Sequence, residues 1–217
     1  MGAIVNGANP PDFAQLAGAL ELRRDEVCSS FQRLTRTGEL TLWPDSYSLR
    51  LLPPFGVGSG DVTVGGALVG GGARNWRTWG LWHALGIPAA LAGIGLVLPA
   101  VTVGVRDPRG GEPIPLRLSG STVSPDPGAP EPVVLIRSPF SRWWNDPAAA
   151  ISAVTLVDSE AVGHAAGVTV PLQQLSDLAR HWYADRLRPQ WRPYTSAEAR
   201  TLADSVGLRG PEWQLRP

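Results

Sequence analysis

The sequence offers almost no thiol chemistry, because Cys28 is the only cysteine among its 217 residues. One cysteine excludes an internal disulfide and a metal site built from several cysteines. Lysine is absent, so all 19 basic residues are arginine, and 19 acidic residues balance them to a formal net charge of zero. A neutral chain has no overall field that would attract nucleic acid or an acidic partner, which leaves only local patches for such contacts.

Long hydrophobic runs are also scarce. The uncharged stretch from Leu85 to Val105 has the length of a bilayer span, but Pro88 and Pro99 interrupt it. Because proline removes a backbone donor and bends a helix, we expect a buried helix followed by a strand here, and no membrane partner. The stretch MGAIVNGANPPDF lacks a basic region followed by an apolar run, so we expect no signal peptide and a cytoplasmic location.

Residues 1–54 have the pattern of a winged-helix-like domain. Apolar residues at helical spacing predict one helix around 13–20 and a second around 27–37, with Gly38 as the stop signal. Residues 39–52 alternate between polar and apolar side chains around the turn signal WPDS, which predicts a hairpin. Two helices followed by a hairpin are typical of winged helices.

Arginine side chains on the second predicted helix raise the question of DNA binding. Arg33 and Arg36 lie on the helix that would enter a major groove. However, Asp25 and Glu26 reduce the charge of this region, and the neutral chain has little charge with which to neutralise phosphates. We therefore expect this domain to pack against the rest of the chain rather than to bind DNA.

The remaining chain divides at a stretch rich in glycine and proline, residues 55–75, which predicts a loop-rich connection to a core domain of residues 76–217. In the core domain, periodicity predicts a helix over 76–91, strands over 101–105 and 114–118 joined by the turn DPRGG, a proline-rich loop over 124–132, strands over 132–138 and 150–156, and helices over 170–191 and 196–206. The expected class is α+β, with a winged-helix-like N-terminal part followed by a mixed β-sheet core with flanking helices.

We expect no cofactor and no resident metal ion. The triple glycine at 70–72 is not followed by the GK[ST] of a phosphate loop, and no G-x-G-x-x-G motif lies between a clear strand and a helix. The three histidines, His83, His164 and His181, lack the spacing of metal ligands.

Four segments together resemble the alkylmercury (organomercurial) lyase family: WGLWHALGIPAAL, VTVGVRDPRGGEPIPL, VVLIRSPFSRWWNDPAAA and AGVTVPLQQLSDLARHWYADRL. The resemblance covers about Leu16 to Leu187 and implies a winged-helix-like part joined to a mixed β-sheet core. In that family the first segment looks like W-C-x-x-D-x-L-x-x-P and the third has a second cysteine after a phenylalanine. Two thiolates capture the soft mercury ion, and the aspartic acid supplies the proton that cleaves the carbon–mercury bond.

This chain departs from the family pattern at each reactive position. Trp79 matches the family tryptophan, but Gly80 stands at the first cysteine position and His83 at the aspartate position. Ser141 follows Phe140 where the family has its second cysteine. The resemblance therefore supports the fold and argues against carbon–mercury cleavage.

His83 is the leading catalytic candidate, because histidine transfers protons near neutral pH and this residue occupies the family's proton-relay position. Ser141, as a nucleophile near His83, and Asp146, as an acidic partner, are the other catalytic candidates. The alternatives are a hydrogen-bonded core histidine and a plain loop serine. Aromatic walls suit small organic molecules, and the candidate substrate-binding residues are Trp79, Gly80, Trp82, Arg142, Trp143 and Asn145.

Three functions follow from these observations. The first is an enzyme without a metal that transfers protons on a small organic molecule, as a lyase, an isomerase or a cyclase. The second is a winged-helix regulator that senses a small molecule in a degenerate pocket. The third is a genuine alkylmercury lyase, which the missing thiols disfavour.

Overall fold

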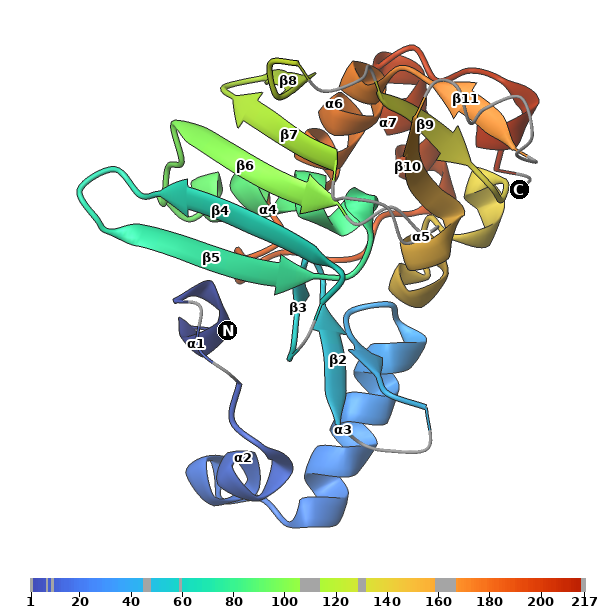
Figure 1. The fold of residues 1–217 in the computed structure, drawn as a ribbon. Coiled ribbons are helices and arrows are strands. Elements are labelled where there is room, and N and C mark those ends of the chain that lie inside the picture. Colours follow the sequence, from blue (N-terminus) through green and yellow to red (C-terminus); the bar gives the residue numbers. More distant parts are fainter. Residues whose placement is uncertain are drawn as a thin grey trace.

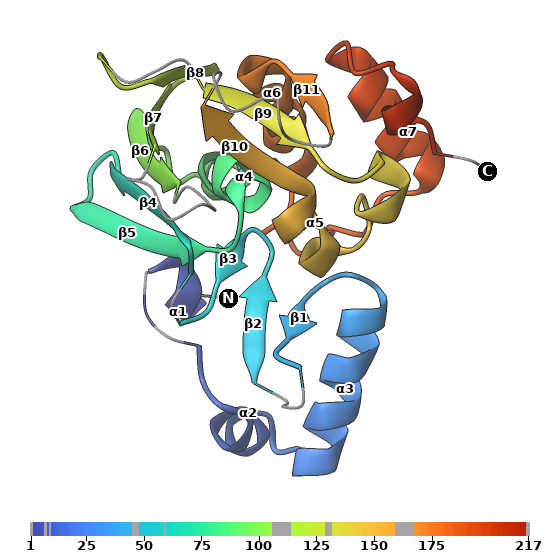
Figure 2. The ribbon, with the colours of Figure 1, turned by 45° about the vertical axis from the view of Figure 1, so that its right-hand side comes forward.

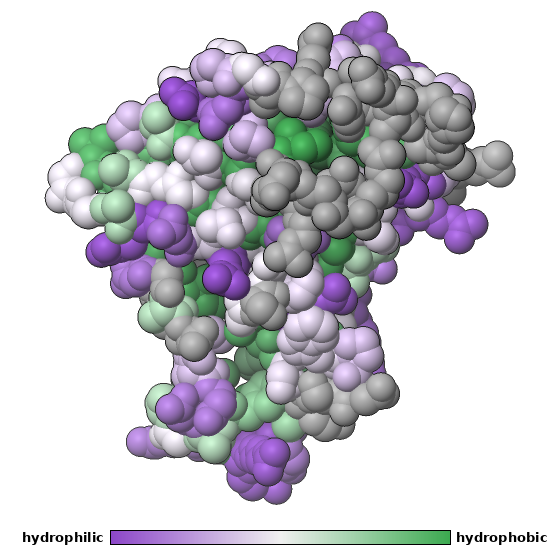
Figure 3. Space-filling model, in the orientation of Figure 1, coloured by the Kyte–Doolittle hydropathy of each residue, from purple (hydrophilic) through white to green (hydrophobic). Residues whose placement is uncertain are grey.

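The computed structural model describes residues 2–6, 8, 10–44, 48–58, 60–105, 114–128, 132–158 and 167–215. Two antiparallel sheets with helices packed against them form the upper body, and a smaller unit of helices and a hairpin lies below it (Figure 1). The fold is therefore α+β, as the sequence predicts. In the space-filling view, hydrophobic residues on this face are scattered among hydrophilic ones (Figure 3).

The lower unit contains the two predicted helices, α2 (Phe13–Leu20) and α3 (Arg24–Arg36), and the predicted hairpin of β1 (Thr41–Leu42) and β2 (Leu49–Leu52). The middle of the WPDS turn, residues 45–47, lies outside the described residues. A short strand, β3 (Phe55–Gly56), pairs with β2. Acidic side chains in the first turn of α3 and arginines in its last turn suit the helix dipole.

The larger sheet corrects the prediction of a loop-rich stretch over 55–75. Its strand order is β5-β4-β6-β7-β8, and both β4 (Val62–Ala67) and β5 (Ala73–Thr78) fall within or overlap that stretch. Val62 and Val64 are buried on one face of β4, as in an alternating strand, but the glycines that follow them interrupt this pattern in the sequence. The strands β6 (Ala100–Val105) and β7 (Ile114–Ser119) are confirmed, whereas β8 (Thr122–Pro125) was expected to be partly loop. The DPRGG turn is outside the described residues.

The aromatic stretch around Trp76 divides differently from the prediction. Trp76 and Thr78 belong to β5, and α4 begins only at Leu81 and runs to Ala92. The strand extends because Thr78 pairs with Val62 in the β4–β5 ladder. Nine of the twelve residues of α4 are buried and lie on all of its faces, so it is a core helix.

The smaller sheet has the order β10-β9-β11, formed by β9 (Pro132–Ile136), β10 (Val154–Asp158) and β11 (Val168–Val170). The predicted strand over 150–156 is wrong in its first half, where α5 (Pro147–Ala153) is helical. Two further helices, α6 (Leu172–Tyr183) and α7 (Ser196–Ser205), are confirmed, although α6 ends eight residues earlier than predicted.

Short elements complete the fold: α1 (Gly2–Val5), η1 (Phe140–Arg142) and η3 (Pro211–Trp213). Buried residues from α1, β3, the larger sheet, α4 and α6 belong to one hydrophobic core. The division of the chain at residues 54 and 75 stays a prediction. No helix in the described part of the chain is long and apolar enough to span a bilayer.

Candidate functional site

His83 lies in the first turn of α4 and is fully buried. Its Nδ1 is 2.7 Å from the hydroxyl of Tyr183 on α6, and its Nε2 is 3.0 Å from the carbonyl oxygen of Pro147 at the start of α5. A carbonyl oxygen only accepts, so we assign the proton to Nε2, and Tyr183 then donates to Nδ1. The imidazole is therefore held in one tautomer between two other helices.

Burial sets the protonation of this pair. Burial, aided by the positive charges of Arg186 and Arg50 and opposed by the hydrogen bond to the Pro147 carbonyl, lowers the pKa of His83 to about 4. Burial also raises the pKa of Tyr183 above its ordinary value, against the opposing effect of Arg186. Both side chains are consequently neutral at pH 7.

A small cleft opens beside this pair, with a free volume of about 40 Å³. It lies where α4 and α6 meet the loop before α5, the end of α3 and the segment after α6. Most of its wall is aromatic or proline: Pro53, Trp82, His83, Trp143, Trp144, Pro147, Trp182, Tyr183, Trp191, Pro193 and Tyr194. A water molecule needs about 10–15 Å³ of such volume, so the cleft has room for only a few heavy atoms.

The lower unit closes one side of the cleft. Thr37 and Gly38, directly after α3, are part of its wall. A side chain at Gly38 would meet the carbonyl oxygen of Asn145, so the two segments are in close contact. Figure 2 shows α3 and the β1–β2 hairpin below α5. This contact supports the expectation that the N-terminal unit packs against the core.

Arg186 is the charged residue of the cleft wall. It follows α6 and is only 7% exposed. Its Nε donates to the carbonyl oxygen of Pro53 at 2.9 Å, and its Nη2 donates to that of Glu39. The guanidinium lies 3.6 Å from the ring centre of Trp191, in cation–π contact.

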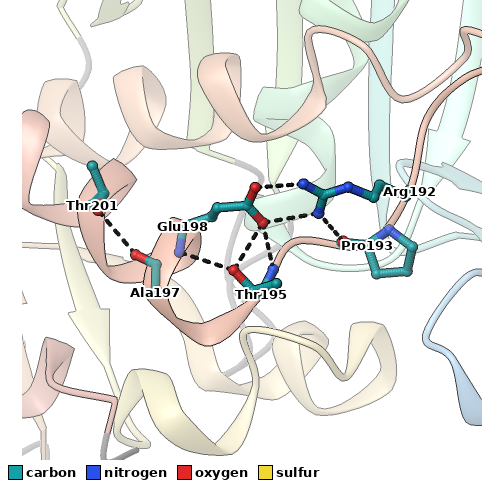
Figure 4. A network of polar contacts seen from close by, with 6 residues as sticks. All are labelled: Arg192, Pro193, Thr195, Ala197, Glu198 and Thr201. Atoms are coloured by element: carbon teal, nitrogen blue, oxygen red, sulfur yellow. Dashed lines mark hydrogen bonds and ion pairs between the residues drawn. The ribbon is translucent and has the colours of Figure 1, made fainter.

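Arg186 and Trp191 belong to the segment 184–195. Hydrogen bonds to α7 hold the C-terminal end of this segment in place. Arg192 forms two hydrogen bonds to the carboxylate of Glu198 in the first turn of α7 (Figure 4). Glu198 also accepts from the backbone and hydroxyl of Thr195, which completes a capping box. These contacts hold the pKa of Glu198 down at about 2.

A second arginine lies near His83 in an aromatic setting. Arg50 on β2 contacts the rings of Trp43 and Trp79, at 4.9 and 5.1 Å from their centres. Its Nε and the indole nitrogen of Trp79 are buried without a hydrogen-bond partner within the described ranges. Trp79 is thus part of an arginine–tryptophan cluster and not of the cleft wall.

The structure brings together some of the predicted site residues and separates others. Trp82, Trp143 and Asn145 line the cleft with His83. Trp82 and Trp143 also pack edge to face in the core, with ring centres 5.3 Å apart. Asn145 is exposed at the rim.

Ser141 and Arg142 are exposed in η1 and do not line the cleft. The carboxylate of Asp146 accepts hydrogen bonds from the backbone of residues 148 and 149 and caps α5. We expected Ser141 to lie near His83. Both ring nitrogens of His83 bond to other groups, so Ser141 forms no hydrogen bond with that ring. His83 therefore does not activate Ser141 through a direct hydrogen bond, and the carboxylate of Asp146 caps α5.

Gly80 is the N-cap of α4, two residues after the end of β5, and has a backbone conformation that only glycine adopts easily, with φ 75° and ψ 156°. A Cβ at this position would lie 2.9 Å from the carbonyl oxygen of Ile151. Its N–H donates to the carboxylate of Asp61 at 2.8 Å. Gly80 is therefore a turn residue outside the cleft wall.

Sequence reasoning missed Tyr183, Arg186 and Trp191. The sequence pattern gives none of the three a role in the site and places all of them on the predicted helix over 170–191. The proline at 189 and the arginine-rich run RLRPQWRP are the signals that could have marked a separate segment. Gly86 on α4 permits the tyrosine to approach, because a Cβ there would collide with the Tyr183 ring.

His164 is outside the described residues, and His181 is exposed on α6. In the described part of the chain, no three histidine, cysteine, aspartate or glutamate side chains gather closely enough to hold a metal ion.

Comparison with solved structures identifies the architecture around this cleft. The fold is similar to that of MerB2. The structure described as the crystal structure of the mercury-bound form of MerB2 superposes with a TM-score of 0.56, covering 87% of this chain and 85% of that chain at 16% sequence identity. At this identity the likeness extends to the fold alone, and it agrees with the fold that the sequence resemblance implies. No family model and no curated protein match the sequence.

Proposed function

We propose that the protein binds a small organic molecule in the cleft and transfers a proton to or from it, without a metal ion in the step. The observation that carries this proposal is the 2.7 Å contact between the Tyr183 hydroxyl and Nδ1 of His83 at the cleft wall. Such a pair, buried among aromatic rings, excludes bulk water from the proton that moves.

The proton would move in two linked transfers. The Tyr183 oxygen takes a proton from the bound molecule while the tyrosine passes its own proton to Nδ1 of His83. The resulting imidazolium keeps its Nε2–H bond to the Pro147 carbonyl, and the reverse transfers return a proton to the molecule. Removal and return of a proton is the common element of lyase, isomerase and cyclisation steps, and general acid–base catalysis contributes about 10²–10⁴-fold to the rate.

Carbon–mercury cleavage does not fit this chain. Capture of mercury by two thiolates needs two cysteines, and Cys28, on α3, is the only one in the sequence. A protonolysis assay with a simple organomercurial is expected to show no activity above the uncatalysed rate. Release of hydrocarbon in proportion to enzyme concentration would contradict this.

Deuterium exchange tests the proposed proton transfer without knowledge of the natural substrate. We expect the wild-type protein to accelerate exchange of the methyl protons of pyruvate in D₂O, followed by proton NMR. Tyr183→Phe and His83→Gln are each expected to lower this rate by about 10²-fold. Tyr194→Phe is the matched control, because Tyr194 also lines the cleft but does not contact His83. Equal rates in the wild type and Tyr183→Phe would refute the role of the pair.

A further inference from the structure

We propose that Arg186 makes the cleft an anion site, and that the molecule it binds is a short-chain carboxylate. This inference rests on the proposed function in one respect, namely that the cleft is where the molecule binds. It adds the chemical class of that molecule.

Arg186 is a buried cation without an ion-pair partner among the described residues, and the more distant charge of Glu39 favours its charged form. Arg186 is 93% buried, and no carboxylate in the described ranges lies within ion-pair distance of it. Nε and Nη2 donate to two backbone carbonyls, whereas Nη1 has no hydrogen-bond partner in the same ranges. Burying a cation is unfavourable unless a counter-charge or hydrogen bonds compensate it. A bound anion would supply the missing partner.

Trp191 provides a second donor next to this guanidinium. Its ring stacks on Arg186 at 3.6 Å, and its indole N–H is buried without a partner within the described residues. Both side chains line the cleft and come from the same segment. An arginine and a tryptophan N–H that come from one segment suit the oxygen atoms of a carboxylate.

The charge of the surroundings favours the same ligand. No aspartate or glutamate is among the residues that line the cleft in the described part of the chain. The charges that act on His83 are those of Arg186 and Arg50, both positive. A carboxylate in the cleft would offset this positive field and make His83 a better proton acceptor, which couples binding to the proposed proton transfer.

The size of the cleft limits the anion. A free volume of about 40 Å³ holds roughly three or four waters and therefore a molecule of few heavy atoms. Trp82 and Trp144 provide apolar wall for a short alkyl group. Carboxylates of two or three carbons are therefore the candidate ligands.

Acetate and acetamide are the matched probes, because they have the same number of heavy atoms and differ in charge. We expect sodium acetate, exchanged for sodium chloride at constant ionic strength, to change the tryptophan fluorescence with a Kd of about 1 mM. Acetamide is expected to bind at least about tenfold more weakly. Equal binding of the two probes would overturn the anion site.

Two variants locate the site. Arg186→Met is expected to weaken acetate binding by about 10- to 100-fold, with Arg180→Met as the surface control. Arg186 also donates to two backbone carbonyls, so Trp191→Phe serves as the second variant. It keeps an aromatic ring and loses an N–H that has no partner among the described residues. It is expected to weaken acetate binding by roughly 3- to 10-fold. Unchanged acetate binding in both Trp191→Phe and folded Arg186→Met would overturn the assignment. If Arg186→Met does not fold, acetate binding by Trp191→Phe and the comparison with acetamide decide.

Failure of this inference is distinguishable from failure of the proposed function. Tyr183→Phe is expected to keep acetate binding and lose deuterium exchange. Acetate binding that depends on Arg186, together with no exchange in the wild type, would contradict the proton transfer and leave the anion site standing. Exchange of acetone as fast as that of pyruvate, with no acetate binding, would overturn the anion site and leave the proton transfer standing.

Discussion

Acidification between pH 7 and pH 5 is expected to destabilise this protein through His83. The side chain is fully buried, and its pKa is lowered from 6.5 to about 4 by burial and by the charges of Arg186 and Arg50. In the unfolded chain the imidazole takes up a proton around pH 6.5, whereas in the folded protein it stays neutral until about pH 4. The unfolded state therefore binds more protons between these values, and stability falls as the pH falls.

The magnitude follows from the two pKa values. The gap between them corresponds to about 3 kcal/mol of unfolding free energy once both states are protonated. About 2 kcal/mol of this falls between pH 7 and pH 5. The contribution is complete above pH 6.5 and is lost as the pH falls toward 4.

Urea denaturation at half-unit steps from pH 7.5 to 5 measures this contribution. His83→Gln is the matched variant, because it removes the titrating ring and leaves His164 and His181 in place. We expect the wild type to lose about 2 kcal/mol more than the variant over this range. Parallel pH dependence of the two proteins would refute the neutral, buried assignment. Nitrogen NMR is a second check, with the proton expected on Nε2.

Three further perturbations test the packing around the site. Gly80→Ala is expected to lower the unfolding free energy by about 1–3 kcal/mol in urea titrations, because a Cβ does not suit this backbone and would meet Ile151; an unchanged midpoint would contradict this. Gly86→Ala is expected to cost about 1–3 kcal/mol and to abolish exchange activity by displacing the Tyr183 ring, and retention of full activity would count against the tyrosine's role. Glu198→Gln is expected to lower the Tm slightly at low salt, with a difference that shrinks at high salt and stays constant from pH 7 to pH 5, since the pKa of Glu198 is about 2; a difference that grows with salt would contradict this.

The sequence predicted the elements whose burial has a regular period. The strand β6 and the helix α6 bury alternate and every third or fourth residue, respectively, and both patterns are visible in the amino-acid order. By contrast, β4 contains Gly65 and Gly66, whose lack of side chains broke the alternation. The helix boundary near Gly80 was also missed, because neither its positive φ nor its close approach to Ile151 has a signal in the local sequence pattern.

Of the candidate site, the sequence predicted His83 but not the residues that contact it, because those contacts are also tertiary. His83 was found because the family resemblance marks its position. Its partners lie 100 and 64 residues away along the chain, at Tyr183 and Pro147, and no local pattern connects such distant residues. Arg186 is one arginine among many in the sequence, and only its burial beside Trp191 distinguishes it.

The conformation of Gly80 has a consequence for how this chain can change over generations. The family resemblance assigns a cysteine to this position, and one or two nucleotide changes can convert a glycine codon to a cysteine codon. Yet any side chain here would strain the backbone and collide with Ile151, so the intermediate protein would be less stable before it gained any thiol chemistry. Acquisition of a thiol at this position would therefore require concerted change in the turn and in α5.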